Sequence, residues 1–536
     1  MDILISPKGL KINTKVWQQS INCKWNNVSS HTTHIIKSSY NMKCKIIITL
    51  TVFVFIACKT RFSIEEKRSL RPNILWIVVE DMSSHFGYQG NKCVKTPNVD
   101  RLAQEGIVYN NAYTSGPVCS ASRSAIITGM YQTSIGAQNH RSSKGTLKIQ
   151  LPENIKTIPE IFREAGYYTC NGTERIGQAG KEDYNFDYES KKLYNGVDWS
   201  GRAERQPFFA QIQLRGGKLR NVPKWQDEVN KGLDKSLLIK PEEVTVPPYY
   251  PDVNAFRQDW ADYLNDVQYT DIEVGNILSR LEKDDLLKNT IIFFITDHGV
   301  SQARGKQFLY DEGTRIPFIV WAPKLFKNKS IDDLISNIDI SATSLQLAGI
   351  SIPSYLQSNS LLGSEYKSRD FVISARDRCD ETVDHIRSVR KGNFKYIKNY
   401  LAERPYLQPN AYKDHKPWMR VLKDLDREGK LNKTQKLVTS KIRPVDELYD
   451  LSTDPFELTN LAFNGKYINK LNELKKILRD WIVDTGDKGD TPESEAMYDS
   501  NMEAYLNEMK RGKELDQVPI IEENIRIMKK WALEGK

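Results

Sequence analysis

Three nearly continuous apolar runs of strand length mark the chain: Asn73 to Val79, Pro207 to Leu214 and Thr290 to Ile295. Runs without polar alternation are typical of strands that are buried on both faces of a parallel sheet. Between the second and third runs, Asp266 to Leu281 carries apolar residues at helical spacing and predicts a helix of the core. The pattern predicts an α/β fold in which helices cover a large sheet.

The pattern changes from Ile352 onward. Phe371 to Ser374 is strand-like, and His385 to Ile397 predicts a hairpin that turns at Gly392. Ile468 to Ile482 is amphipathic at helical spacing, and we expect this helix to cover a small sheet. We therefore expect a large domain at 71–351, a smaller subdomain of antiparallel sheet plus helix at 352–487, and a helical extension at 488–536.

The positive charge of the chain is concentrated in its leader. The formal net charge is +9, but residues 1–57 hold seven Lys, no Arg and one Asp, so that the remaining chain carries 70 basic and 67 acidic groups. This near balance removes the main support for nucleic-acid binding. With 39% hydrophobic and 27% charged residues, the composition is that of an ordinary soluble protein.

The end of the leader has the pattern of an export signal at residues 42–57. Lys43 and Lys45 precede a twelve-residue apolar run, Ile46 to Ala57, which is short for a membrane span. The run ends in Ile56-Ala57-Cys58, which resembles a bacterial lipobox and implies that Cys58 is lipidated. We expect an exported, membrane-anchored lipoprotein at the periplasm or cell surface, with residues 58–70 as a tether; an uncleaved anchor or a plain signal peptide is the alternative.

Five cysteines follow residue 57. Cys58 is the expected lipid site, and Cys119 begins a predicted helix. The other three, Cys93, Cys170 and Cys379, lack the spacing of a disulfide framework or a zinc site, and we expect them to be packing residues.

The stretch from Cys119 to Gly129, CSASRSAIITG, follows a Gly-Pro break and predicts a buried helix. Backbone N–H groups at a helix N-terminus favour an anion and lower the pKa of a thiol there. The stretch resembles the signature of the formylglycine-dependent sulfatases, in which a Cys, followed four positions on by Arg, is oxidised to formylglycine (3-oxoalanine). Cys119 and Arg123 fit this signature, with Ala121 where Pro is commoner. Taken without the resemblance, Cys119 is a small core residue.

Acidic residues follow two of the apolar runs: Glu80 and Asp81 after the first, and Asp297 with His298 after the third. Ligands gather at the carboxyl ends of parallel strands, and carboxylate oxygens suit a divalent cation. Solvated charge at the strand ends is the alternative. The resemblance implies that these residues and Cys119 hold calcium, with Glu80 where Asp is usual and His298 as a ligand or as the partner of a ligand.

The resemblance also implies a set of cations around the sulfate group. Lys181 and Lys306 stand where the family has sulfate-binding lysines. Asp183 and Lys218 stand where the family usually has histidines. We expect the lysines and Arg123 to neutralise charge on the sulfate oxygens. Asp183 is a candidate for activating the nucleophile, and Lys218 is a candidate general acid if burial lowers its pKa.

Other polar residues are candidates for contacts to the remainder of the substrate. His140 and Arg141 lie in the loop that follows the signature helix, and Arg376, Arg378 and His385 lie in a charge-dense stretch of the C-terminal subdomain. A surface loop and a solvated rim are the alternatives. Together these side chains predict a pocket for a charged sugar.

From the motifs and their order, the chain is identified as a member of the type I formylglycine-dependent sulfatase family, in a polysaccharide-active bacterial branch. The resemblance implies an alkaline-phosphatase-like fold, in which a large mixed sheet lies between helices and a smaller α+β domain follows. It implies a sulfuric ester hydrolase that uses a hydrated formylglycine and a calcium ion on a sulfated glycan, for which ulvan is the first expectation. A formylglycine-generating maturation system is then a required partner.

Three alternatives to this function stay open. The substrate can be a heparan-type glycan carrying N- or O-sulfate, or the same fold can hydrolyse a phosphomonoester or phosphonate. The replacement of both family histidines, at Asp183 and Lys218, motivates the third alternative, a glycan-binding lipoprotein without catalysis.

Overall fold

The computed structural model describes residues 71–536 apart from residues 364, 365, 367 and 513. The expected signal segment, the lipid site at Cys58 and the tether lie outside the described residues. In the part of the chain that is described, no helix has the length and apolarity that crossing a bilayer requires.

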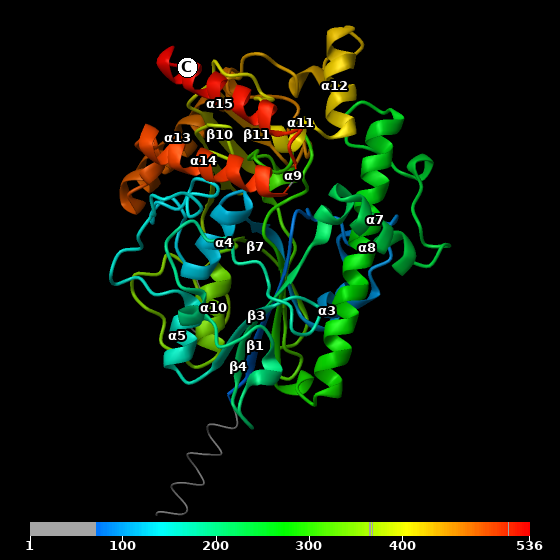
Figure 1. Ribbon diagram of the computed structural model, residues 1–536, viewed down its shortest axis with the longest axis vertical. Helices are drawn as coiled ribbons and strands as arrows, with labels where there is room; N and C mark the ends of the chain where they lie inside the picture. The colour runs from blue at the N-terminus through cyan, green and yellow to red at the C-terminus, as the bar shows by residue number, and fades with distance from the viewer. Residues whose placement is uncertain (1–70, 364–365, 367, 513) are drawn as a thin grey trace, which may run out of the picture. The chain divides into compact units, whose positions relative to one another are not determined.

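A seven-stranded sheet forms the middle layer of the larger part of the structure (Figure 1). Its strands lie in the order β3-β4-β1-β5-β6-β2-β7. They are β1 (Asn73–Val79), β2 (Ile107–Tyr113), β3 (Tyr168–Gly172), β4 (Phe208–Leu214), β5 (Thr290–Thr296), β6 (Phe318–Trp321) and β7 (Lys329–Ser336). β1 pairs in parallel with β4 and β5, whereas β6 is antiparallel to both of its neighbours. The sheet is therefore mixed, as predicted.

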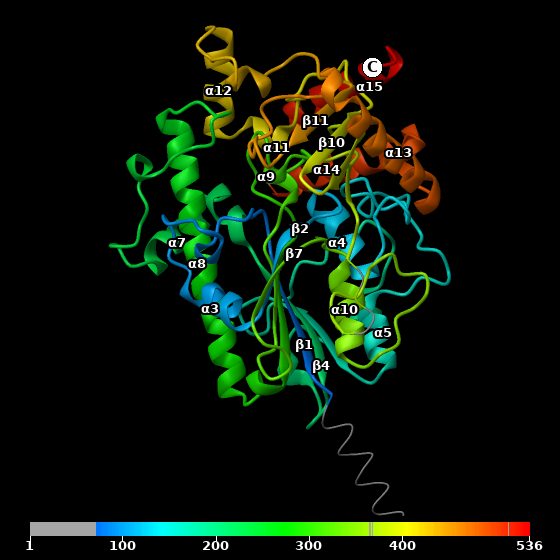
Figure 2. The ribbon, with the colours of Figure 1, turned by 180° about the vertical axis from the view of Figure 1, so that it is seen from behind.

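Helices cover both faces of this sheet (Figures 1 and 2). The helices of one layer are α3 (Pro97–Glu105), α7 (Pro223–Gly232) and α8 (Asn254–Lys283), and those of the other are α4 (Cys119–Thr128), α5 (Ile158–Glu164) and α10 (Asp339–Leu347). Alternate residues of β1 serve the two layers: Leu75, Ile77 and Val79 pack in the core beside α8, whereas Ile74 and Trp76 pack with residues of α4 and α5. Because both faces of the strand are buried, its sequence has no polar alternation.

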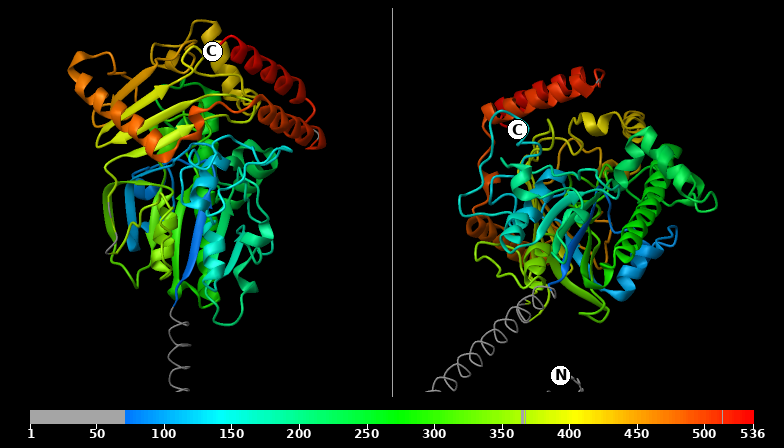
Figure 3. Two further views of the ribbon diagram at one scale, coloured as in Figure 1. Left: turned by 90° about the vertical axis from the view of Figure 1, so that its left-hand side faces the viewer. Right: turned by 60° about the horizontal axis from the view of Figure 1, so that its bottom comes forward.

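A second, four-stranded antiparallel sheet lies beyond one end of the large sheet (Figure 3). Its strands are β8 (Val372–Arg376), β9 (Ile386–Lys391), β10 (Phe394–Asn399) and β11 (Asp446–Asp450), in the order β11-β10-β9-β8. β9 and β10 form the predicted hairpin, and Gly392 takes a φ of +53° at its turn. The predicted amphipathic helix is α13 (Ile468–Thr485), whose Leu474 and Leu478 pack in a core with Val389 of β9.

The remaining helices surround the small sheet or connect the layers. They are α6 (Ser190–Leu193), α9 (Asp311–Thr314), α11 (Ala411–Asp414), α12 (Pro417–Arg427), α14 (Glu495–Gly512) and α15 (Val518–Leu533). α14 and α15 pack through Tyr505 and Ile521, and Ala411 of α11 joins the same apolar cluster. The C-terminal extension is therefore attached to the segment that carries α11.

Candidate active site

The ends of four adjacent strands supply the site. β3, β4, β1 and β5 are neighbours in the sheet, and their carboxyl ends lead to Lys181, Lys218, Glu80-Asp81 and Asp297-His298 respectively. Two glycines, Gly216 and Gly217, let the loop after β4 approach β1. A Cβ at Gly216 would collide with the backbone carbonyl of Glu80, and a Cβ at Gly217 would collide with that of Asp81. This approach brings Lys218 to the acidic end of β1.

Cys119 is the first residue of α4 and lies at the same end of the large sheet. Every residue of α4 is buried, so the helix is fixed by packing on all sides. Ser122 Oγ donates a hydrogen bond of 2.6 Å to the backbone carbonyl of Asp297, which ties the first turn of α4 to the end of β5. Cys119 is only 2% exposed. The signature helix thus presents the thiol to the strand-end residues, as predicted.

Four buried side chains form a cluster that can hold a metal ion: Asp81, Cys119, Asp297 and His298. His298 Nε2 lies 3.2 Å from Cys119 Sγ and 3.4 Å from Asp81 Oδ1. Asp81 has a φ of +54°, a left-handed conformation that is uncommon for a residue with a side chain. The backbone is therefore held in a strained conformation at one of the two carboxylates.

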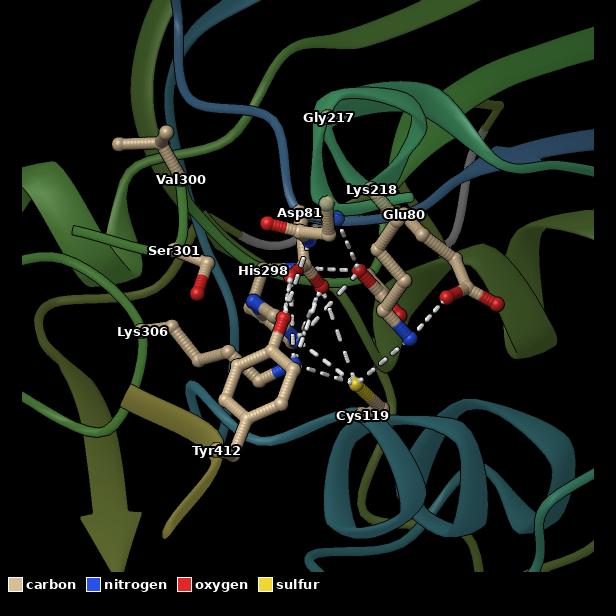
Figure 4. Close-up of polar contacts among 12 residues, drawn as sticks. Glu80, Asp81, Cys119, Gly217, Lys218, His298, Val300, Ser301, Lys306 and Tyr412 are labelled. Atoms are coloured by element: carbon tan, nitrogen blue, oxygen red, sulfur yellow. Dashed lines mark hydrogen bonds and ion pairs between the residues drawn. The ribbon is translucent and has the colours of Figure 1, made fainter. Parts of the chain in front are cut away.

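Cations surround this cluster (Figure 4). Lys306 Nζ lies 3.1 Å from Cys119 Sγ and 3.2 Å from each carboxylate oxygen of Asp81. Arg123 Nη2 lies 3.2 Å from Asp297 Oδ2, and Lys218 Nζ lies 3.6 Å from the Cys119 sulfur. Each buried carboxylate and the thiol thus has a positively charged side chain at contact distance. Buried ions need such a partner of opposite charge.

Glu80 does not belong to the four-residue metal cluster. Its carboxylate contacts Lys218 and lies 3.3 Å from Lys181 Nζ and 3.2 Å from Arg123 Nη2. Burial alone would raise the pKa of Glu80, but Lys181 and Lys218 outweigh burial and lower the pKa to about 2. The structure therefore places Glu80 in contact with three cations that are expected to bind sulfate, and its role as a metal ligand stays a prediction.

The cations change the acidity of the nucleophile candidate. Burial alone would raise the pKa of the Cys119 thiol, but the neighbouring cations, led by Lys181 and Lys218, outweigh it and lower the pKa to about 5. The pKa of Lys218 is instead raised well above its usual value, because Cys119 and acidic neighbours outweigh the effect of burial. The lowered pKa that we expected for Lys218 is therefore not seen, and the lysine is protonated at neutral pH.

Asp183 faces the cations from the loop after β3. Its carboxylate lies 3.2 Å from Lys181 Nζ. Burial alone would raise the pKa of Asp183, but Lys181 and then His140 outweigh it and hold the pKa well below its usual range. Asp183 is therefore ionised at neutral pH.

A cavity of about 430 Å³ opens above these residues. Its lining includes Cys119, Asp183, the predicted substrate-contact residues His140 and Arg141, and the lysines expected to bind sulfate, Lys181, Lys218 and Lys306. The cavity has the size of a small-ligand pocket and is lined mostly by polar groups. The structure thus brings most of the predicted site residues to one place.

Comparison with protein-family models matches residues 72–350 to the sulfatase model. The chain belongs to the sulfatase family. A second model, described as the C-terminal domain of N-sulphoglucosamine sulphohydrolase, matches residues 298–406. The predicted family is confirmed, and the chain is a sulfuric ester hydrolase.

Two curated relatives illustrate the range of this family. An ulvan-active sulfatase of Formosa agariphila is 36% identical over 475 residues, which cover 80% of this chain and 78% of the relative. Human N-sulphoglucosamine sulphohydrolase is 24% identical, with 77% of this chain and 90% of the human protein covered.

Solved sulfatase structures share the fold. One, in complex with its substrate D-glucosamine-2-N,6-O-disulfate, has a TM-score of 0.54 at 20% identity and covers 79% of this chain and 100% of its own. Another, a 2-O GAG sulfatase, has a TM-score of 0.56 at 20% identity and covers 80% of this chain and 96% of its own. The likeness confirms the expected fold, a large mixed sheet between helices followed by a smaller α+β domain.

Several residues of the sulfatase pocket were not predicted from the sequence. Tyr412 of α11 donates a hydrogen bond of 3.3 Å from its hydroxyl to Asp81 Oδ2, and Lys306 Nζ lies 5.0 Å from the centre of its ring. Asp380 and Glu508 line the same pocket, and both contact Arg141. Asp380 belongs to the charge-dense stretch noted in the sequence, whereas no pattern in the sequence marks Tyr412 or Glu508.

Three predicted substrate-contact residues lie outside this pocket. Arg376 is buried and bonded to Asp384 at 2.6 Å. Arg378 is bonded to Glu493 at 2.6 Å and lines a second cavity of about 560 Å³. His385 lines the same cavity, stacks on Tyr400, and has a pKa lowered to about 3 by burial and the charge of Arg387. The structure therefore does not bring these three side chains to Cys119, because partners within the C-terminal part hold them.

The three remaining cysteines differ in environment. Cys170 and Cys379 are buried, as expected of packing residues. Cys93 is exposed, and our expectation for it is wrong, because it lies in a short surface turn and not in a core element.

Proposed function

We propose that this sulfatase removes sulfate from a sulfated polysaccharide or its oligosaccharides, of the ulvan type, outside the cytoplasm. The observation that carries the proposal is the gathering of four cations: Lys218 and Lys306 lie at the sulfur of the buried Cys119, and Lys181 and Arg123 join the same group through Glu80. Four cations around one small pocket suit a sulfuryl group in transfer, because negative charge on the sulfate oxygens and on the leaving oxygen is stabilised where it develops. The ulvan-active relative supports the substrate class.

We further propose that a maturation system, with its own oxidant, converts Cys119 to formylglycine. The hydrate of this aldehyde supplies the oxygen nucleophile that attacks sulfur. Burial at the first residue of α4 holds position 119 in one orientation, with Lys306 and Lys218 at 3.1 and 3.6 Å from the sulfur. Groups placed in this way are pre-organised for the reaction.

The donor set fits a divalent cation. Asp81 and Asp297 are 0% exposed and each offers a carboxylate, His298 offers a ring nitrogen, and residue 119 completes the cluster. Two buried carboxylates at one point repel each other unless positive charge lies between them. We propose calcium at this position, for which carboxylate oxygens are the preferred donors. When bound, calcium would add positive charge at this cluster.

The side chains of the pocket divide the remaining work. Arg123, Lys181, Lys218 and Lys306 bind the sulfate oxygens in this proposal. Glu80 occupies the place between Arg123, Lys181 and Lys218 and keeps these cations together until an anionic substrate competes for them. His140 and Arg141 line the same cavity and face the sugar.

The lipid anchor and export are also part of the proposal. The signal pattern at 42–57 and the lipobox-like Ile56-Ala57-Cys58 support a lipoprotein at the periplasm or cell surface. A position outside the cytoplasm suits an enzyme whose substrate is a polymer too large to enter the cell.

The test is sulfate release from a panel of substrates by the matured enzyme. The panel contains ulvan oligosaccharides, heparan-type oligosaccharides carrying N- or O-sulfate, an aryl sulfate and the matching aryl phosphate. We expect the highest kcat/KM on an ulvan oligosaccharide and a lower value on the aryl phosphate than on the aryl sulfate. Faster turnover of the phosphate, or tight glycan binding without any sulfate release, would overturn the proposal.

A further inference from the structure

His140 is the one histidine that lines the pocket around Cys119 within the described residues. It lies in the loop between α4 and α5, and its side chain is 7% exposed. The family position after Lys181 holds Asp183, which pairs with Lys181, and Lys218 stands where a histidine was expected and contacts Glu80 and the Cys119 sulfur. Ion-paired side chains thus occupy both family histidine positions, and His140 is the histidine in the cavity lining that can protonate the sugar oxygen that leaves sulfur.

Asp380 holds one edge of the His140 ring. His140 Nδ1 lies 3.1 Å from Asp380 Oδ1, and the Sγ of Cys379 lies 3.7 Å from the same nitrogen. The other ring nitrogen, Nε2, has no hydrogen-bond partner among the residues that the structure describes. Because His140 lines the cavity, this nitrogen is free to donate to a bound substrate.

Arg141 and helix α14 hold the His140–Asp380 pair in place. Arg141 Nε lies 2.9 Å from the same Asp380 oxygen, and Arg141 in turn pairs with Glu508 of α14 at 2.9 Å. The ring of Tyr505, also in α14, lies 4.8 Å from the Arg141 guanidinium carbon. Helix α14 thus holds Arg141 against Asp380, and Asp380 in turn orients the imidazole of His140. A carboxylate placed in this way orients a histidine for proton transfer.

Backbone strain is concentrated at the same place. Among the described residues, eight non-glycine residues have a positive φ, and three of them, Arg141, Asp183 and Asp380, line this cavity. Their φ values are +66°, +54° and +50°. Such conformations persist where surrounding structure enforces them, and they cluster at functional sites. The strain therefore supports a functional role for the wall that carries His140.

The acidity of the pocket groups agrees with this geometry. Burial alone would lower the pKa of His140, but Asp380 and Cys379 outweigh it and raise the pKa to about 9. Burial raises the pKa of Tyr412 to about 12 and that of Tyr188 further. Among these side chains His140 combines a proton at neutral pH with the ability to release it. The charged and titratable groups around its ring are Asp380 and Cys379 after β8, Arg141 in its own loop, Asp183 after β3 and Tyr505 of α14.

We propose that His140 is the catalytic proton donor to the leaving sugar oxygen and that Asp380 is the residue that positions it; the proposal rests on the sulfatase function proposed above. The bond between sulfur and the sugar oxygen breaks while the nucleophile at residue 119 takes the sulfuryl group. The electron pair of the broken bond stays on the sugar oxygen, which takes the Nε2 proton of His140. The free sugar hydroxyl leaves, and the neutral imidazole regains a proton from water.

The test compares leaving groups in the His140→Gln variant. A sugar alkoxide is a strong base and needs the proton, whereas 4-nitrophenolate is a weak base and leaves without it. We expect kcat/KM on the sulfated oligosaccharide to fall about 10²- to 10⁴-fold and to fall at least tenfold less on 4-nitrophenyl sulfate. Equal losses on the two substrates would overturn the proposal.

Two further variants separate proton donation from packing. Cys379→Ala changes the same cluster but keeps both the donor and its carboxylate partner Asp380, so His140 should stay protonated at pH 7 and the ratio of the two activities measured there should stay at the wild-type value. Asp380→Asn removes the charge that stabilises the imidazolium, so the alkaline limb of kcat/KM on the oligosaccharide should move to lower pH. An unshifted limb in Asp380→Asn would contradict the positioning role.

The wild-type enzyme provides a test that does not depend on the folding of a variant. Protonated His140 is present below about pH 9 and is lost as the pH rises through that value. Activity on the oligosaccharide should therefore fall above about pH 9, and activity on 4-nitrophenyl sulfate should fall less. Identical alkaline limbs would overturn the proposal, whereas a wild type that releases no sulfate from any sulfated glycan would overturn the proposed function instead.

Discussion

At the scale of single residues, the site holds several charges in a volume from which water is largely excluded. Asp81 and Asp297 are 0% exposed, and Arg123 and Lys306 are 2% and 4% exposed. An isolated buried charge is costly, so each of these groups depends on its opposite. A substitution that removes one charge leaves its partner uncompensated, and its effect should exceed the loss of one hydrogen bond.

Asp297→Asn should weaken calcium binding at least about 10- to 100-fold, the cost that the loss of even a supporting residue carries at metal sites. The substitution keeps the shape of the side chain and removes one of the two carboxylates of the cluster. Titration calorimetry of the chelator-treated enzyme with calcium provides the measurement. The matched control is Asp183→Asn, a carboxylate of the same pocket that pairs with Lys181 and lies outside the cluster. Equal weakening in both variants would contradict the assignment.

The residue types in the sequence predicted which segments form the site, but not which side chains contact one another. The sequence predicted Cys119, Lys306 and Asp81 because strand ends and a family motif marked them. It predicted Glu80 as a metal ligand but did not predict the contacts of Glu80 with Lys181 and Lys218, since a carboxylate at a strand end gives no sign of which lysines it will meet. Tyr412 was missed because a lone tyrosine between Ala411 and Lys413 has no pattern of its own.

At the scale of elements, the strands of the large sheet that are buried on both faces were the ones whose bounds could be predicted from the sequence. β1, β4 and β5 appeared in the sequence within about one residue of their observed bounds, because their apolar runs are uninterrupted. β2 and β7 were not predicted. β2 carries Asn110 and Asn111 in its middle, and β7, an edge strand, carries Asp332 and Asp333. Polar residues are tolerated in these strands because part of each is exposed to solvent.

Short α11 links the C-terminal part to the catalytic loop. Lys413 is buried and donates from Nζ to the carbonyl oxygens of Gln302 and Lys306, at 3.1 and 2.8 Å. Its neighbour Tyr412 bonds Asp81. The helix therefore fixes both the backbone of Lys306 and one carboxylate of the metal cluster.

Tyr412→Phe should lower kcat/KM about tenfold, equivalent to about 1.4 kcal/mol, because it removes a hydrogen bond to a buried carboxylate. Steady-state kinetics on a sulfated oligosaccharide would measure the change. Tyr400→Phe is the matched control, since Tyr400 stacks on His385 and is not part of the lining of the Cys119 pocket. If both substitutions have the same small effect, Tyr412 does not support the site.

The small sheet depends on the apolar face of α13. Leu474 is 0% exposed and packs against the sheet, whereas Val483 of the same helix is 78% exposed. Leu474→Ala should lower the free energy of unfolding by about 2–5 kcal/mol through lost burial and a cavity. Val483→Ala should change it by less than about 0.5 kcal/mol. Urea unfolding of the two variants measures both values, and similar shifts would show that α13 is not packed as described.

At the scale of the whole molecule, the pocket is assembled from distant parts of the chain. The large sheet supplies the metal cluster and the lysines, the segment with α11 supplies Tyr412, and α14 supplies Glu508. The sequence predicted a large and a small sheet, but it did not predict that the C-terminal extension reaches the pocket. Contacts between segments more than 350 residues apart, such as Arg141 with Glu508, leave no local pattern.

Attachment to a membrane is a property of the whole chain that Cys58 should control. In a bacterial host with a lipoprotein pathway, we expect the wild type in the membrane fraction and Cys58→Ser in the soluble exported fraction. Immunoblots of separated fractions provide the measurement. Cys93→Ser, which changes an exposed cysteine of the folded part, should stay with the membrane. Membrane association of Cys58→Ser would contradict the lipid anchor.

Catalysis in this proposal depends on the oxidation of Cys119 to a nucleophile that cations surround, and mass spectrometry of the peptide that contains residue 119 tests this most directly. The peptide should come from enzyme whose sulfate-releasing activity has been measured. We predict a residue lighter than cysteine by the change from thiol to aldehyde, in a fraction that rises with specific activity. Fully active enzyme that retains an unmodified Cys119 thiol would contradict the account.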